Sequence, residues 1–203
     1  MKSALLIGSA LLVSALPSAA SAEPVLLISI DGLQPDDVIE ADNRGIDIPN
    51  LKRFITQGSY AQGVRGVLPT VTYPSHATLI TGVSPSRHGI FGNISFDPLQ
   101  INQGGWYWYA TDFRVPTLWD IAAKAKLTTA NVHWPVSVNA SAVKWNIPQI
   151  WRTGHADDAK LLKSLATPGL IESLESQLGE YAPGIDESIT GDEIRGQFAT
   201  ALI

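Results

Sequence analysis

The fold class is decided by the stretch Val25-Leu26-Leu27-Ile28-Ser29-Ile30-Asp31-Gly32, in which an aliphatic run ends in an acidic turn. A run that is apolar on both faces is typical of a central strand in a parallel sheet. Asp31 is then expected at the carboxyl end of that strand, which is the edge where open α/β sheets bind ligands. The stretch therefore predicts an α/β domain with a candidate site beside Asp31.

Downstream of this stretch, segments with helical spacing alternate with short β-branched segments. Proline near the start and glycine after the end delimit one helical segment clearly, at Pro74 and Gly82. The expected helices cover residues 47–57, 74–81, 116–125 and 157–181, with a break at Pro168-Gly169, and a last helix starts near Thr190; the expected strands cover residues 60–68 and 128–132. This alternation predicts a central, mostly parallel sheet with helices on both faces.

Three local features sharpen these expectations. Leu118, Trp119 and Ile121 are spaced to direct one helix face into the core. Lys126 stands where a glycine would end that helix more easily, and a left-handed lysine there costs about 1 kcal/mol. The stretch Thr190-Gly191-Asp192-Glu193 has capping-box spacing and predicts a helix start.

The two ends of the chain predict a signal peptide and a truncated domain. Lys2, the apolar stretch after it and the small residues Ala20-Ser21-Ala22 predict a secretory signal peptide over residues 1–22, with an uncleaved anchor as the alternative. The product is expected to be exported, to the periplasm or the medium. The last helix reaches Ile203 without a cap or polar tail, so residues 23–203 are interpreted as the N-terminal part of a truncated domain.

Composition limits the function classes. The chain carries 14 basic and 19 acidic residues, a net charge of −5, and no basic block that would bind a polynucleotide backbone. It has no cysteine, so export brings no disulfide framework, and a metal ion would be held by His, Asp, Glu or hydroxyl ligands. Such ligands suit hard or borderline cations such as zinc.

Two residues form a candidate reactive pair. Asp31 can offer a carboxylate to a divalent cation. Thr72 is expected near a helix N-terminus, where backbone N–H groups and the helix dipole favour an anion. A metal ion held by Asp31 would lower the pKa of the Thr72 hydroxyl and make it a nucleophile. Taken singly, Asp31 also fits a turn residue and Thr72 a helix cap.

Several sequence blocks extend this pair in a specific order and spacing. They are Ile28-Ser29-Ile30-Asp31-Gly32-Leu33, Pro69-Thr70-Val71-Thr72-Tyr73-Pro74-Ser75-His76, Thr81-Gly82, and Pro85 with His88-Gly89-Ile90. Together they closely resemble the type I phosphodiesterase/nucleotide pyrophosphatase branch of the alkaline phosphatase superfamily, over most of residues 25–200. The resemblance implies an alkaline-phosphatase-like α/β fold.

The resemblance also implies roles for single residues. Thr72 matches the nucleophile, which forms a covalent intermediate, and Asp31 matches a metal-bridging aspartate. Asn93 matches an asparagine whose amide supports a nonbridging phosphate oxygen, where it would stabilise transition-state charge. Tyr73 matches an aromatic position that stacks on a nucleobase or another leaving group, although a tyrosine that only fills the pocket wall fits equally well.

The resemblance implies two zinc ions, held by Asp31, Thr72 and five further Asp and His residues that this chain lacks. The four histidines do not match those positions and are interpreted as structural or loop residues: His76, His88, His133 and His155. The aromatic run Trp106-Tyr107-Trp108-Tyr109 is likewise interpreted as a structural strand.

The leading functional hypothesis is metal-dependent hydrolysis of a phosphodiester or pyrophosphate bond in a small nucleotide-like substrate. Two alternatives use the same core, a phosphomonoesterase and a phosphonate hydrolase of the phosphonoacetate type. An alternative of another class is a catalytically inactive exported fragment that serves as a binding domain.

Overall fold

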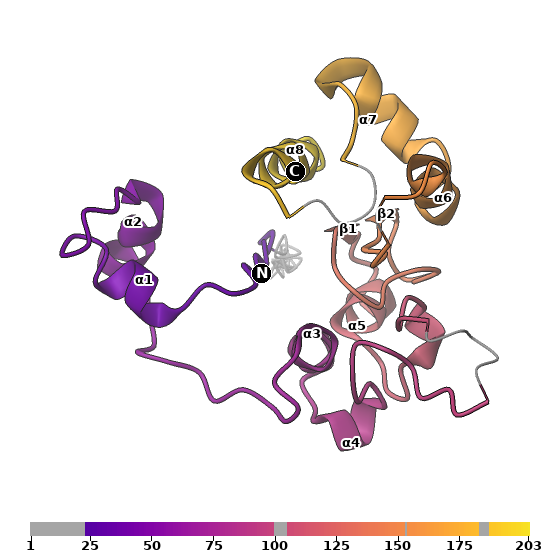
Figure 1. The fold of residues 1–203 in the computed structure, drawn as a ribbon, viewed down its shortest axis with the longest axis horizontal. Helices are drawn as coiled ribbons and strands as arrows, with labels where there is room; N and C mark the ends of the chain where they lie inside the picture. The colour runs from indigo at the N-terminus through magenta and orange to yellow at the C-terminus, as the bar shows by residue number, and fades with distance from the viewer. Residues whose placement is uncertain (1–22, 100–104, 153, 183–186) are drawn as a thin grey trace, which may run out of the picture.

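Helices make up most of the secondary structure in this computed structural model, which describes residues 23–99, 105–152, 154–182 and 187–203. The elements in chain order are α1 (Pro35–Ile39), α2 (Pro49–Gln57), α3 (Thr72–Thr81), α4 (Pro85–His88), the 3-10 helix η1 (Ala110–Asp112), α5 (Leu118–Lys124), β1 (Ala130–Val132), β2 (Trp145–Ile147), α6 (Asp158–Leu165), α7 (Leu170–Leu178) and α8 (Ile189–Thr200). Figure 1 shows α1 and α2 set apart from the other helices.

The sheet of the described residues has two parallel strands. β1 pairs with β2 in a register that places Ala130 beside Trp145 and Val132 beside Ile147. α8 packs against β1 and α7 against β2, so helices cover the pair. This arrangement confirms an α/β chain with parallel pairing. The expected strand over residues 128–132 is present in shortened form, whereas the sequence reasoning did not predict β2.

The strand predicted for residues 25–30 is wrong for this structure. The segment forms no ladder with any described strand, and Val25 is 89% and Ile30 is 51% exposed. The strand predicted for residues 60–68 is also absent. The physical reason is that a strand exists only through hydrogen bonds to a neighbouring strand, and an aliphatic run cannot supply that neighbour by itself.

The helix predictions fare better because their signals are local. α2 and α3 end at Gly58 and Gly82 as expected, and Gly169, with a φ of 75°, separates α6 from α7. Lys126 has a φ of 62°, which confirms the left-handed lysine. Two helix predictions need correction, one for the buried face of α5 and one for the start of α8.

The first correction concerns α5, where Trp119 is buried but Leu118 and Ile121 are each 52% exposed, so this short helix buries only one side chain of the three. The second concerns α8, which starts earlier than expected. Ser188 is its N-cap and accepts a hydrogen bond from the Gly191 N–H, while Thr190 lies inside the first turn. In both cases the local spacing predicts a helix, but packing and capping decide which side chains are buried and where the helix starts.

Three apolar clusters hold the chain together. The largest joins β2 to α6, α7 and α8 through Ile147, Leu162, Ile171, Leu174 and Phe198. The other two clusters both contain residues of α3: Tyr73, Ala77, Ile90 and Val136 in one, and Ile80, Trp119, Trp134 and Val143 in the other. One face of α3 is therefore anchored in the core, which fixes the position of its N-terminus.

A buried polar network supports the turn between β1 and β2. The Asn131 amide donates to Ser137 Oγ at 3.0 Å and to Asn146 Oδ1 at 2.6 Å, and its Oδ1 accepts from the Trp134 N–H at 3.2 Å. The Asn146 amide in turn donates to the Ser137 carbonyl. All of these groups find partners, so the network holds the turn in one conformation that places Val136 against Tyr73.

Candidate active site

The candidate site is built on the N-terminus of α3. Val71 precedes the helix in an extended conformation, and no side chain caps it. Tyr73, Ala77 and Ile80 are buried on the inner face of the helix, while Thr72, its first residue, is half-buried. The first N–H groups of a helix lack helical acceptors, and the helix dipole is positive there. Thr72 therefore lies in surroundings that favour a negative charge.

Asp31 reaches Thr72 across a separation of 41 residues. The Thr72 Oγ1–H donates to Asp31 Oδ2 at 3.0 Å. Asp31 lies in the turn that follows the extended segment 25–30, and its side chain is exposed. The two residues predicted as nucleophile and metal ligand are thus in direct contact, although the strand expected to carry Asp31 is not formed.

Asn93 lies against the same helix turn. Its Oδ1 accepts a hydrogen bond from the Tyr73 N–H at 2.9 Å, and its main-chain carbonyl accepts from the Tyr107 N–H at 3.0 Å. Because Oδ1 is occupied, the orientation of the amide is defined and Nδ2 supplies the remaining two donors. Those donors have no partner among the residues that the structure describes. Asn93 can therefore donate to an anion at the start of α3.

Tyr73 is positioned differently from a stacking residue. Its side chain is fully buried, and its ring packs edge-on against Trp106 with 5.3 Å between centroids. Burial raises the pKa of the Tyr73 hydroxyl, which has no hydrogen-bond partner within the described chain. A ring without an exposed face cannot stack on a leaving group in this arrangement. The geometry fits the second of its predicted roles, that of a side chain filling the pocket wall.

His76 is the neighbour of the site that the sequence reasoning missed. Its Nδ1 lies 2.8 Å from the Thr72 carbonyl oxygen, and its Nε2 lies 2.9 Å from Ser29 Oγ. The signal that could have found it is the spacing of two pairs, Ser29 with Asp31 and Thr72 with His76. Residues two apart in an extended segment and four apart in a helix each lie on one side of their element.

The other histidines fit structural roles. His88 is buried, accepts at Nδ1 from the Ile90 N–H and contacts Thr78 Oγ1 through Nε2. Burial lowers the pKa of His88, an effect that the Pro74 carbonyl partly opposes. Burial is also the main cause that lowers the pKa of His133 to about 3, with a smaller contribution from the Arg195 charge.

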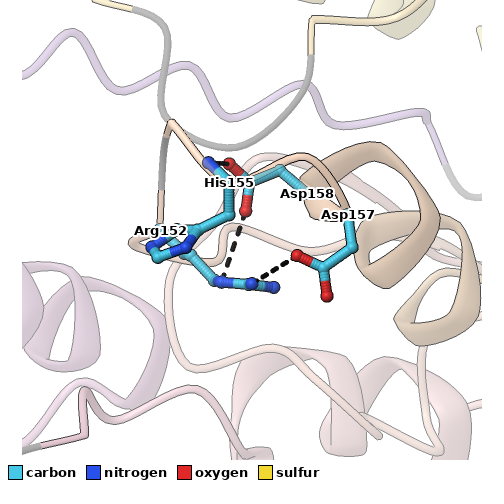
Figure 2. A network of polar contacts seen from close by, with 4 residues as sticks. All are labelled: Arg152, His155, Asp157 and Asp158. Atoms are coloured by element: carbon cyan, nitrogen blue, oxygen red, sulfur yellow. Dashed lines mark hydrogen bonds and ion pairs between the residues drawn. The ribbon is translucent and has the colours of Figure 1, made fainter.

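His155 belongs to an ionic cluster that follows β2 and starts α6. Figure 2 shows the Arg152 guanidinium group with contacts to the carboxylates of Asp157 and Asp158. The nitrogen-to-oxygen distances are 2.5 Å to Asp157 Oδ1 and 3.3 Å to Asp158 Oδ1. The main-chain N–H of His155 donates to Asp158 Oδ2 at 2.8 Å. The hydrogen bond from Arg152 is the main cause that lowers the pKa of Asp157. These contacts tie a loop to a helix start, and His155 takes part in them through its main-chain N–H.

The aromatic run 106–109 also has a structural role. Trp106 forms an antiparallel bridge with Ile94, and Tyr109 forms a parallel bridge with Val138, but the run is not a continuous strand. The Trp106 indole stacks on Trp151 at 4.7 Å between centroids, with 17° between the ring planes. It thereby forms a layer over the buried Tyr73 ring.

Asp31 and Thr72 together supply only part of a site for a divalent metal ion. Asp31 and Thr72 offer two oxygen atoms 3.0 Å apart, a chemistry that fits part of a coordination sphere. Within the described ranges, no three His, Cys, Asp or Glu side chains gather closely enough to complete one. His76 does not add to the pair, because both of its ring nitrogens already have partners.

Comparison with known proteins places these residues in a family. The model of the type I phosphodiesterase / nucleotide pyrophosphatase family matches residues 25–188, a range that contains Asp31, Thr72 and Asn93. This chain belongs to that family. The resemblance stated from the sequence blocks is therefore confirmed.

Individual relatives share shorter regions with the chain. Ectonucleotide pyrophosphatase/phosphodiesterase family member 3 of Rattus norvegicus is 28% identical over 137 residues, which are 64% of this chain and 15% of the relative. Venom phosphodiesterase of Naja atra is 29% identical over 62% of this chain and 16% of the relative. Bis(5'-adenosyl)-triphosphatase enpp4 of Mus musculus is 35% identical over 39% of this chain and 16% of the relative.

The aligned part of the chain thus spans roughly a sixth of the length of these curated relatives. Residues 1–22, where the signal peptide is predicted, lie outside the described residues. In the part of the chain that is described, no helix has the length and apolar character needed to cross a membrane. Export therefore stays a prediction.

Proposed function

We propose that this chain carries the nucleophile half of the active site of a metal-dependent phosphodiesterase or nucleotide pyrophosphatase. The observation that supports this most directly is the 3.0 Å hydrogen bond between Thr72 Oγ1 and Asp31 Oδ2 at the N-terminus of α3. Membership of the family and the names of the relatives favour a nucleotide or another small phosphodiester as the substrate. An alkaline-phosphatase-like architecture for the whole domain is part of the same proposal.

The Thr72 hydroxyl oxygen attacks the phosphorus atom of the substrate. Thr72 Oγ1 forms a bond to phosphorus, the bond from phosphorus to the leaving oxygen breaks, and the leaving group departs with the electron pair. The hydroxyl proton passes along the existing hydrogen bond to the Asp31 carboxylate, which then releases it to water. Water then cleaves the phosphothreonine ester, which releases the phosphate product and restores the hydroxyl.

Charge on the phosphoryl oxygens is stabilised by N–H donors. The Thr72 main-chain N–H has no helical acceptor because it is the first of its helix, and the Asn93 amide supplies Nδ2. Donors that are already oriented before the reaction stabilise developing charge without a reorganisation cost. Because the Tyr73 N–H fixes Oδ1 of Asn93, that side chain is pre-oriented in this sense.

Asp31 and Thr72 are the residues that would hold a divalent cation such as zinc, and a second cation is part of the proposal. When bound, such a cation lowers the pKa of the hydroxyl and neutralises phosphate charge. The further ligands that a two-metal site requires are not gathered in the described residues.

The test is hydrolysis, with added Zn²⁺ or Mn²⁺, by the purified protein that contains this chain together with any segments that follow it in its gene. Bis(p-nitrophenyl) phosphate and the p-nitrophenyl ester of thymidine monophosphate report diesterase activity, while p-nitrophenyl phosphate reports monoesterase activity. We expect metal-dependent diester cleavage that Thr72→Ala abolishes and Thr72→Ser partly retains. Metal-dependent cleavage no faster than that of Thr72→Ala would reject catalysis by this chain and favour the binding-domain alternative. A preference for the monoester would favour the phosphomonoesterase alternative.

A further inference from the structure

Two hydrogen bonds join α3 to the extended segment 25–30 and the turn that follows it. Ser29 contacts His76, and Asp31 contacts Thr72, at 2.9 Å and 3.0 Å. Ser29 and Asp31 are two residues apart in the segment, and Thr72 and His76 are four apart in the helix. The two pairs are therefore in register, with one side of the segment facing one side of the helix.

The direction of the hydrogen bonds follows from the acceptor on α3. The Thr72 carbonyl can only accept, so Nδ1 of His76 carries a hydrogen and donates at 2.8 Å. On a neutral ring, Nε2 then accepts from the Ser29 hydroxyl. The ring thus bridges the main chain of the candidate nucleophile and the side chain of Ser29.

The core holds the His76 ring in this orientation. The side chain is 9% exposed, and the Trp134 indole packs edge-on against it, with 5.2 Å between centroids and 80° between ring planes. The main chain of Trp134 is itself fixed by the buried network, because its main-chain N–H donates to Asn131 Oδ1. A ring that is fixed by packing loses little freedom when it binds Ser29, so the contact is effective in holding the segment.

The segment depends on this contact because it lacks sheet support. Residues 25–30 form no ladder with a described strand, and their apolar side chains are largely exposed. In the described chain, this segment is connected to α3 by the hydrogen bonds of Ser29 and Asp31. Without the Ser29 contact, Asp31 would be held against Thr72 by a single exposed hydrogen bond.

We propose that His76 is a positioning residue, which clamps Ser29 so that the Asp31 carboxylate stays against the Thr72 hydroxyl. The importance of this role for hydrolysis rests on the function proposed above. The clamp itself is a claim about geometry and can be tested without activity.

The natural absence of cysteine allows a direct test. Asp31→Cys and Thr72→Cys together introduce two thiols and leave the three clamp groups intact: the Ser29 hydroxyl, the His76 ring and the Thr72 carbonyl. A short bis-methanethiosulfonate reagent then reports how often residues 31 and 72 are adjacent. We expect Ser29→Ala to slow this cross-link about fivefold, which is the effect of losing one ordinary hydrogen bond, and Ser29→Thr to restore it to within about twofold.

His76→Asn is the matched variant on the helix side. Its amide can donate to the Thr72 carbonyl in place of Nδ1 but is too short to reach Ser29. It is expected to slow the cross-link as much as Ser29→Ala does, and the double variant Ser29→Ala/His76→Asn to slow it no further. Thermal unfolding of each variant shows that it is folded, and Ser29→Ala, at an exposed position, keeps the test valid if His76→Asn does not fold. A cross-linking rate unchanged by Ser29→Ala overturns the clamp.

Hydrolysis adds a second readout that separates the two proposals. In the protein with Asp31 and Thr72 intact, Ser29→Ala should lower kcat about five- to tenfold with little change in KM, and Ser29→Thr should recover it. A cross-link that depends on Ser29 in a protein without any hydrolysis supports the clamp and rejects the catalytic function. Hydrolysis and cross-linking that are both insensitive to Ser29→Ala reject the clamp and leave the catalytic function standing.

Discussion

Oδ1 of Asn93 accepts a hydrogen bond from the main-chain N–H of Tyr73 at 2.9 Å, which turns the amide nitrogen of Asn93 away from that contact. The residue next to the candidate nucleophile thereby orients a donor that the family resemblance assigns to phosphate.

Asn93→Asp keeps the acceptor that binds the Tyr73 N–H and removes the donor that is assigned to phosphate. A carboxylate can still accept from the Tyr73 N–H, but it offers no donors and adds a negative charge beside the phosphate. We expect kcat/KM for bis(p-nitrophenyl) phosphate to fall about 10²- to 10³-fold, with unfolding temperature nearly unchanged. Asn139→Asp, in an exposed turn, is the control. A loss of less than about threefold would show that the amide does not stabilise the reaction.

Asp31→Asn tests the charge of the carboxylate without removing its acceptor. The amide oxygen can still accept from Thr72 Oγ1, but a neutral ligand binds a divalent cation more weakly. We expect kcat/KM to fall at least about 100-fold and half-maximal activity to require more Zn²⁺ or Mn²⁺. Titration of each metal into the chelator-treated protein is the measurement. An unaltered metal requirement would contradict the assignment of Asp31 as a ligand.

His133 predicts a dependence of stability on pH. Its pKa in the folded protein is about 3, below the unfolded value of about 6.5. Between pH 6.5 and 3, His133 therefore binds a proton in the unfolded state but not in the folded state. The free energy of unfolding falls as the pH is lowered through this range. The slope from one such group is at most about 1.4 kcal/mol per pH unit.

His133→Asn removes this titration and suits the backbone, because asparagine tolerates the φ of 63° found there. Urea unfolding at pH 7.5, 6.0 and 5.0 should show a shallower loss of stability in the variant than in the parent. His155→Asn, whose ring is exposed, is the control and should follow the parent. Identical pH profiles for all three proteins would contradict the role of His133.

Lys126→Gly is expected to stabilise the fold. The Lys126 N–H donates to the Ala123 carbonyl and the Leu127 N–H to the Ala122 carbonyl, both at 2.9 Å, which is the Schellman pattern with a left-handed residue at Lys126. Glycine adopts that conformation freely, so we expect the free energy of unfolding to rise by about 0.5–1 kcal/mol. Lys124→Gly, at the last residue of α5, should lower it by about 0.5–1 kcal/mol. Chemical denaturation distinguishes the two directions.

Asn131→Leu tests the buried network. The substitution leaves groups of Trp134, Ser137 and Asn146 without their partner in the core, so we expect a loss of about 3 kcal/mol in the free energy of unfolding. Asn50→Leu, at an exposed position of α2, should change it by less than about 0.5 kcal/mol. A comparable effect of the two substitutions would mean that the network adds nothing to stability.

The sequence by itself determined the elements whose signals are local. Gly58, Gly82 and Gly169 end or separate helices because their φ/ψ freedom or lack of a side chain interrupts the helix wherever the chain goes. The order and spacing of the blocks around Asp31 and Thr72 also sufficed to identify the family. The strand that the aliphatic run predicts for residues 25–30 is not formed, since its hydrogen-bonding partner is not encoded in the run.

Only the tertiary structure decided how the candidate site residues meet. The contacts of Asp31 with Thr72 and of Ser29 with His76 join residues more than 40 positions apart, and no periodicity within either segment specifies the distance between them. The burial of Tyr73 and the orientation of Asn93 are set in the same way, by Trp106, Val136 and the first turn of α3. Local propensity decides where a helix starts and stops, whereas the direction in which a side chain points depends on what packs against it.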